Sequence, residues 1–164
     1  MMRTREAEVS ARAIHAHVAA AEPVAGRAGM GVVFVDTHGR VLRRIGRMLP
    51  GVATRELAAF RGILYALWNS RRLGSRWVVV HSDNPDVVAQ INGVLDVDPA
   101  LVGPYLEVRA LLHAYRGARV EAGETIMGRE AAAVAQAAIE HDTDDIVEDL
   151  PLWAGQPSLV QTPA

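Results

Sequence analysis

WVVVHSDNPDVVAQING, residues 77–93, joins an apolar run to a carboxylate and then to the expected start of a helix. The run 76–82 is too uniformly apolar for a strand with one exposed face, so we expect a parallel strand that is covered on both sides. Pro85 suits the first turn of a helix, and the Asn-Gly pair that closes the stretch suits its end. Asp83, between strand and helix, has two interpretations: it caps the helix, or it holds a metal ion.

The rest of the chain predicts an α/β domain around that strand. Strands are expected where β-branched or alternating segments occur, and helices where apolar residues recur at helical spacing. The order βββαβαβα, with the two helices before the last strand counted together, fits a mixed five-stranded sheet flanked by helices. The expected strands are 12–19, 28–36, 40–49, 76–82 and 118–122, and the expected helices are 55–72, 85–92, 99–116 and 127–141.

The first strand is the least obvious of these elements. Residues 12–19 lie in an Ala-rich stretch with helix propensity, yet apolar residues alternate there with His15 and His17. A mixed sheet needs one more strand to pair with both the hairpin of 28–49 and the strand at 76–82. We therefore predict a strand, with the two histidines on its polar, half-exposed face.

Composition places the chain among single-domain globular proteins. Half of its 164 residues are hydrophobic, 22% are charged, and the formal net charge is −2. The sequence contains no cysteine, which excludes disulfides and thiolate metal sites. No segment reaches the roughly 20 apolar residues that a membrane helix needs, and the N-terminus lacks an apolar signal core, so we expect a cytoplasmic protein.

Three segments are predicted along the chain. Residues 1–11 are an N-terminal extension, residues 12–141 form the folded domain, and residues 142–164 form an acidic, disordered tail. The tail assignment rests on its clustered acids, its prolines and its lack of periodicity.

Four motifs follow one another along the predicted domain. HSDNPDVVAQING ends a strand on Ser-Asp and a helix on Gln-Ile-Asn-Gly, and RELAAFRGILYAL opens a helix with a Glu-Leu pair. AGMGVVFVDTHGRVL carries Gly-x-Gly early in a strand, and DVDPALVGPYLEVRALL leads into a helix through Asp-Pro-Ala-Leu. In this order and at this spacing, the motifs resemble type 1 ribonuclease H, of the reverse-transcriptase-like ribonuclease H family, over residues 12–140.

The resemblance implies hydrolysis of the RNA strand of an RNA–DNA hybrid by two divalent ions, usually Mg²⁺. Two such ions need a cluster of carboxylates that holds them beside the attacking water and the leaving oxygen. Glu56 and Asp83 match two of the family's four carboxylate positions, and the resemblance makes them the expected catalytic and metal-binding residues. The other two positions are occupied by Val18 and Ala132, so the acidic site is degenerate. Glu56 shares a helical face with Phe60, so its carboxylate is expected to point toward the sheet.

Other side chains are possible substitutes for the missing ligands. His17 would reach the site if the first strand were shifted by one residue, and imidazole suits Mn²⁺ or Zn²⁺ better than Mg²⁺. Glu130 lies two residues before Ala132. Loop carboxylates are usually solvated, so a substitute ligand is the less favoured alternative. Further acids lie after the first strand and near or beyond the end of the last helix: Glu22, Glu140, Asp142, Asp144 and Asp145.

Arginines are the candidate contacts to nucleic acid. Arg43, Arg44 and Arg47 crowd the third strand, and Arg55 opens the following helix. Such clusters form salt-sensitive contacts to phosphates, but arginines on an edge strand also prevent edge-to-edge pairing. Aromatic residues make up only 5% of the chain, so no platform for stacking bases is expected.

Three functions remain open. The favoured one is a ribonuclease H-like domain that is non-catalytic or weakly active and binds nucleic acid, such as an RNA–DNA hybrid, through backbone contacts. The alternatives are a Mg²⁺- or Mn²⁺-dependent ribonuclease with a remodelled site, and a protein-interaction module such as a homodimer. If the protein is inactive, no cofactor is expected.

Overall fold

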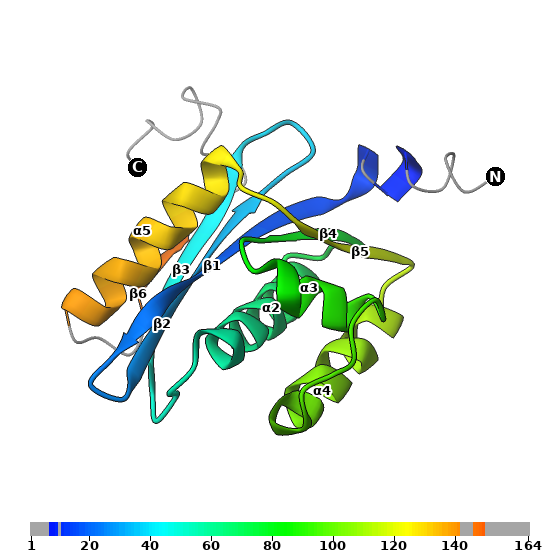
Figure 1. Ribbon diagram of the computed structural model, residues 1–164. Helices are drawn as coiled ribbons and strands as arrows, with labels where there is room; N and C mark the ends of the chain where they lie inside the picture. The colour runs from blue at the N-terminus through cyan, green and yellow to red at the C-terminus, as the bar shows by residue number, and fades with distance from the viewer. Residues whose placement is uncertain (1–6, 10, 142–145, 150–164) are drawn as a thin grey trace, which may run out of the picture.

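A computed structural model describes residues 7–9, 11–141 and 146–149, and a mixed sheet lies at its centre. The strands are arranged in the order β5-β4-β1-β2-β3-β6 (Figure 1). β4 pairs in parallel with both β1 and β5, and the other neighbouring strands are antiparallel. The strands are β1 (Ile14–Val24), β2 (Arg27–Val35), β3 (Val41–Pro50), β4 (Trp77–Ser82), β5 (Gly117–Ala122) and β6 (Ile146–Asp149).

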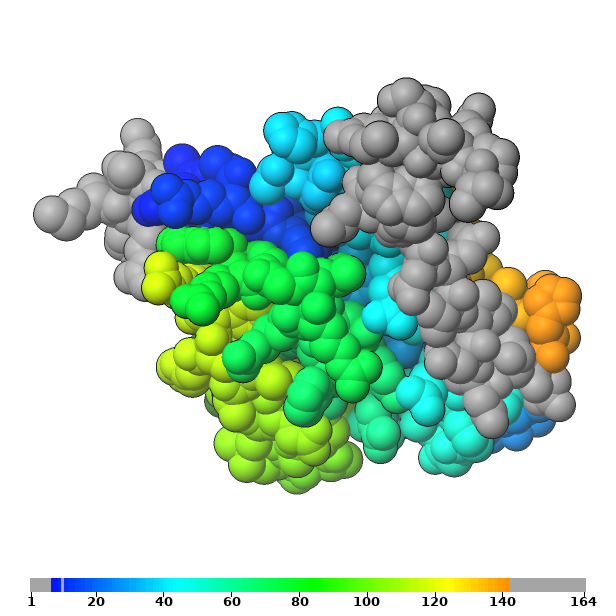
Figure 2. All heavy atoms as spheres, turned by 180° about the vertical axis from the view of Figure 1, so that it is seen from behind, coloured from blue at the N-terminus to red at the C-terminus, as the bar shows by residue number. Residues whose placement is uncertain are grey.

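Helices cover both faces of the sheet. The helices α2, α3 and α4 lie on one side, and α5 lies on the other side against β1, β2 and β3 (Figure 1). Seen from behind, α4 in yellow-green and the end of α5 in orange again lie on opposite sides of the molecule (Figure 2). None of the described helices is long and apolar enough to cross a membrane. The helices are α2 (Arg55–Arg72), α3 (Pro85–Ile91), α4 (Val102–His113), which follows a 3-10 turn (Pro99–Leu101), and α5 (Ile126–Glu140).

The predicted fold class and the five predicted strands are confirmed. β1 is a strand although its sequence favours a helix, because it lies in the centre of the sheet with β4 on one side and β2 on the other. Ala16, Val18 and Ala20 on one of its faces are buried in the main core. Burial and pairing on both edges therefore outweigh the local helix propensity.

A sixth strand, β6, was not predicted. It pairs antiparallel with β3, with Val147 opposite Ile45, and lies in the segment that we expected to be a disordered tail. Only four residues form it, the last two are acids, and two more acids precede it, so no period of two was visible in the sequence. The remainder of the predicted tail, apart from this strand, lies outside the described residues, as does most of the predicted extension 1–11.

Glycines set the distances between the sheet and its two main helices. A Cβ atom on Gly31 would lie 2.0 Å from the carbonyl oxygen of Ala131, so α5 rests directly on β2. On the opposite face, a Cβ atom on Gly62 would lie 2.6 Å from Cγ1 of Val18, so α2 packs closely on β1. The Gly-x-Gly motif of β2 is thus explained by close backbone approach, and both helices are fixed against the central strands that lead into the candidate site.

Candidate functional site

The candidate site lies where the parallel strands β1 and β4 end. Val18 of β1 pairs with Ser82 of β4, and Asp83 follows directly. The carbonyl of Ser82 accepts a hydrogen bond from the backbone of Gly123, which brings the loop before α5 to the same place. The carboxyl ends of parallel strands are the usual position of a ligand site in α/β folds.

Asp83 does not cap the helix that follows it. Asn84 is the N-cap of α3, and its side-chain oxygen accepts a hydrogen bond of 3.1 Å from the backbone N–H of Val87. The backbone N–H of Asn84 in turn donates to Oγ of Ser82, at 3.2 Å. The capping interpretation of Asp83 is therefore wrong, and its side chain is left for another role.

The Asp83 carboxylate faces an arginine. Nη2 of Arg55 lies 3.5 Å from Oδ2 of Asp83, and Nη1 of Arg55 lies 3.1 Å from Oε1 of Glu22. Arg55 is the first residue of α2, and Glu22 lies near the end of β1. A single guanidinium thus bridges two carboxylates that come from different strand ends.

This ion pair satisfies Asp83 only in part. Its Oδ1 is buried and has no hydrogen-bond partner among the residues that the structure describes. Burial raises the pKa of the Asp83 carboxyl above its ordinary value, Arg55 opposes that rise, and the charge of Glu124 adds to it. Burial therefore disfavours the charged form of this carboxyl and Arg55 favours it, and opposing effects of this kind are common at functional sites.

Glu56, the other predicted ligand, lies next to Arg55 at the start of α2. It follows Arg55 in the first turn of α2, and its side chain is exposed although Phe60, one turn further on, is fully buried. Within the described residues, no group of three or more His, Asp or Glu side chains is arranged to hold a metal ion. Glu56 and Asp83 are therefore not joined there by a third ligand.

The two apolar positions are packed. Val18 is 1% exposed and belongs to the main core together with Met30 and Ile63. Ala132 is half-buried and packs on the opposite face of the sheet against the cluster that contains Val33. Neither side chain carries an oxygen or nitrogen that could bind a metal ion.

The predicted helper Glu130 belongs to a different place. Nη2 and Nε of Arg44 lie 2.8 Å and 3.0 Å from Oε1 of Glu130, so this acid is paired with β3. β3 is separated from β4 by two other strands, so Glu130 does not complete the site at Asp83. The candidate acids Asp142, Asp144 and Asp145 lie outside the described residues.

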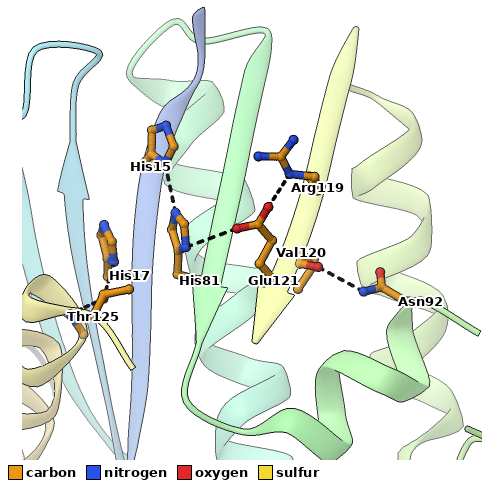
Figure 3. A network of polar contacts seen from close by, with 9 residues as sticks. His15, His17, His81, Asn92, Arg119, Val120, Glu121 and Thr125 are labelled. Atoms are coloured by element: carbon orange, nitrogen blue, oxygen red, sulfur yellow. Dashed lines mark hydrogen bonds and ion pairs between the residues drawn. The ribbon is translucent and has the colours of Figure 1, made fainter. Parts of the chain in front are cut away.

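His17 is part of a histidine cluster that the sequence did not reveal (Figure 3). Its ring stacks on that of His81 with 4.5 Å between the centroids, and Nδ1 of His15 lies 2.9 Å from Nε2 of His81. Nδ1 of His17 lies 2.7 Å from Oγ1 of Thr125, the N-cap of α5. His17 is 9% exposed, so its predicted place on a half-exposed face is wrong.

The cluster favours neutral imidazoles rather than a metal ion. The rings of His15 and His17 lie within 18° and 8° of parallel to that of His81, so the nitrogen lone pairs do not converge on one point. Burial, followed by the charges of His81 and His15, lowers the pKa of His17 to about 4. Burial also lowers the pKa of His81, although Glu121, 3.7 Å from its Nδ1, raises it.

The four predicted nucleic-acid-binding arginines all have partners within the protein. Arg55 and Arg44 form the ion pairs described above. Nη1 of Arg43 donates to Oδ1 of Asn69, at 2.8 Å. Arg47 donates to the hydroxyl of Tyr65, and its guanidinium lies 5.0 Å from the centre of that ring. These arginines therefore connect β3 to α2 and α5, and α2 to the end of β1.

The capping assignment predicts opposite effects of two neighbouring substitutions. Asn84→Ala removes the cap of α3 and should lower the free energy of unfolding by about 1 kcal/mol. Asp83→Asn removes a charge that burial disfavours and should leave that free energy unchanged or raise it at pH 7. Denaturant unfolding of both variants checks the assignment, which fails if Asp83→Asn is the more destabilising of the two.

The histidine cluster predicts loss of stability in mild acid. The pKa of His17 is about 4 in the folded protein and about 6.5 in an unfolded chain, so the unfolded state takes up its proton first as pH falls. The free energy of unfolding should therefore decrease between about pH 6.5 and pH 4, by up to about 3 kcal/mol.

His17→Asn should flatten this decrease, and His113→Asn, on the exposed surface of α4, should leave it as in the wild type. Urea unfolding at a series of pH values measures both. An equally steep decrease in His17→Asn would contradict the assignment.

Comparison with known proteins places the chain among ribonuclease H folds. A sequence model described as reverse transcriptase-like matches residues 18–138. The N-terminal RNase H domain of a Mycobacterium tuberculosis protein, studied as a fusion with maltose binding protein, is 25% identical, with a TM-score of 0.72 over 79% of this chain and 95% of that one. No curated protein sequence matches the chain.

Two further structures share the fold at lower identity. RNase H1 from the halophilic archaeon Halobacterium salinarum is 24% identical, with a TM-score of 0.72 over 78% of this chain and 98% of that one. LC11-RNase H1, a protein isolated from compost by a metagenomic approach, was solved in complex with an RNA/DNA hybrid. In that complex it is 20% identical, with a TM-score of 0.67 over 77% of this chain and 98% of that one.

Proposed function

We propose, from the premise that this chain belongs to the reverse transcriptase-like family of ribonuclease H folds, that it binds nucleic acid without hydrolysing it. The family membership and the ribonuclease H-like domain are established by the match over residues 18–138 and by the shared fold. The absence of hydrolysis is our proposal. A cytoplasmic location and a homodimeric state stay predictions from the sequence.

The observation that carries the proposal is the ion pair between Arg55 and Asp83. Ribonucleases H generally use divalent metal ions, and a guanidinium cannot lose its charge at any ordinary pH. With Nη2 of Arg55 at 3.5 Å from Oδ2 of Asp83, a divalent cation at that oxygen would meet a second, permanent positive charge. The pair thus competes with metal binding at Asp83, the predicted ligand that directly follows β4.

The surrounding residues do not compensate for this competition. Mg²⁺ prefers six oxygen ligands in octahedral geometry, and a two-metal centre needs several carboxylates at one place. Val18 offers none, Glu22 is already paired with Arg55, and no suitable group of three ligands exists in the described part of the chain. The residues around Asp83 therefore do not fit the metal centre of the family, and we derive no catalytic step from them.

Nucleic acid is the partner that the family membership supports. LC11-RNase H1 shares this fold and was solved with an RNA/DNA hybrid. A fold that has lost its metal ligands still presents backbone N–H groups and arginines, and such contacts need no catalysis. A phosphate-binding role without hydrolysis is consistent with both observations.

The test is a paired assay of cleavage and binding with one labelled RNA–DNA hybrid. We expect no cleavage in Mg²⁺ or Mn²⁺ with protein in excess over hybrid, together with binding whose affinity decreases steeply as salt increases. Asp83→Asn should bind the hybrid as the wild type does. Cleavage that depends on metal and disappears in Asp83→Asn would refute the proposal, and an absence of any binding would favour a protein-interaction module.

A further inference from the structure

The outer face of α2 carries an unusual exposed tryptophan. Trp68 is 54% exposed in the C-terminal third of this helix, whereas large aromatic side chains are normally mostly buried. It lines a surface cavity of about 350 Å³ between α2 and α4. A large exposed ring beside a cavity is a candidate contact surface, and its charged neighbours bear on what it could bind.

Arginines lie on both sides of that ring. Arg61, Tyr65, Trp68 and Arg72 are spaced by four, three and four residues, so they form one stripe along the helix. Arg61 and Arg72 are exposed and line the cavity, and no described residue forms an ion pair with either of them. The two charges are about 16 Å apart along the helix axis, at 1.5 Å per residue.

β3 adds two more positive charges beside the stripe. Arg47 lies against the ring of Tyr65, and Arg43 is bonded to Asn69, the neighbour of Trp68. These contacts occupy one face of Tyr65 and fix its position, which leaves the Trp68 ring as the accessible aromatic surface. Among the residues that line the cavity, the only acid is Glu107.

We infer that this stripe is a binding platform for single-stranded nucleic acid, which rests on and deepens the proposed function. A base stacks on Trp68, and phosphates further along the strand in each direction pair with Arg61 and Arg72. Base–aromatic stacking next to arginines is the usual way to hold a single strand without reading its sequence. A duplex keeps its bases stacked inside, so it offers no ring to Trp68, whereas an open strand does.

The platform was missed in the sequence for a physical reason. The low aromatic content of 5% suggested that no stacking surface exists, but one exposed ring between two arginines is sufficient for one base. The positions of Arg43 and Arg47 beside it depend on how β3 lies against α2, which helical spacing alone does not give.

The test compares single strands with a hybrid of the same length by fluorescence anisotropy of labelled oligonucleotides. Trp68→Ala should weaken binding of single-stranded RNA and DNA at least about fivefold, and Trp68→Phe should restore part of the loss, because stacking contributes about 1–3 kcal/mol per base. Arg61→Gln combined with Arg72→Gln should reduce the log–log salt slope by about 1.4. The matched control Arg129→Gln removes one charge from the exposed surface of α5 and should leave both quantities unchanged.

The outcomes separate this inference from the proposed function. If Trp68→Ala retains its fold and single-strand affinity is unchanged while the hybrid is bound by the wild type, the platform is refuted and the proposed function stands. If the wild type binds neither single strands nor hybrid, both fail. If the variants instead abolish self-association in sedimentation experiments and leave nucleic-acid binding unaltered, the stripe is a protein contact and the inference is wrong.

Discussion

The parallel pairing of β1 with β4 is the constraint on which the rest of this structure depends. It aligns Val18 with Ser82 and His17 with His81, and because successive side chains in a strand point to opposite faces, one pairing creates two different environments. On the face of α2, this register places Val18 in the main core, and Asp83 follows directly after its partner Ser82. On the face of α5, the same register stacks the histidine rings (Figure 3). A shift of one residue would exchange the two faces, so the buried core fixes both sites together.

The charge of Asp83 is balanced in part by an arginine of the same chain. In a two-metal site, carboxylates repel one another until cations arrive, which is why such a site binds metal. Here Arg55 supplies a permanent cation from the first turn of α2, and Val18, at a position where the sequence predicted a missing acid, packs in the core. The pKa of Asp83 is still raised by burial, so Arg55 offsets the cost of the buried charge only in part. The Arg55 guanidinium joins the ends of β1 and β4 through Glu22 and Asp83, but it cannot act as a Lewis acid as a metal ion does.

The sequence predicted those features that depend on local periodicity. It gave the order of the strands and helices, because apolar spacing and turn residues are local properties. It did not choose between Asp83 and Asn84 as the cap, since both are good capping residues and only the backbone geometry separates them. It missed the role of His81. This residue lies 66 positions after His15 in the sequence, and the two come together only through the register of β1 on β4. It also missed the stacking surface at Trp68 and the strand at 146–149, because both are created by what lies beside them in space.

The central claim is that Glu56 and Asp83 do not bind divalent metal ions, and metal titration tests it most directly. Calorimetric titration with Mn²⁺, which tolerates poorer coordination than Mg²⁺, should give no saturable heat for the wild type. It should also give none for Asp83→Asn, because no described group of ligands is arranged to hold the ion. Saturable Mn²⁺ binding by the wild type that disappears in Asp83→Asn would contradict the account and would favour a metal-dependent nuclease.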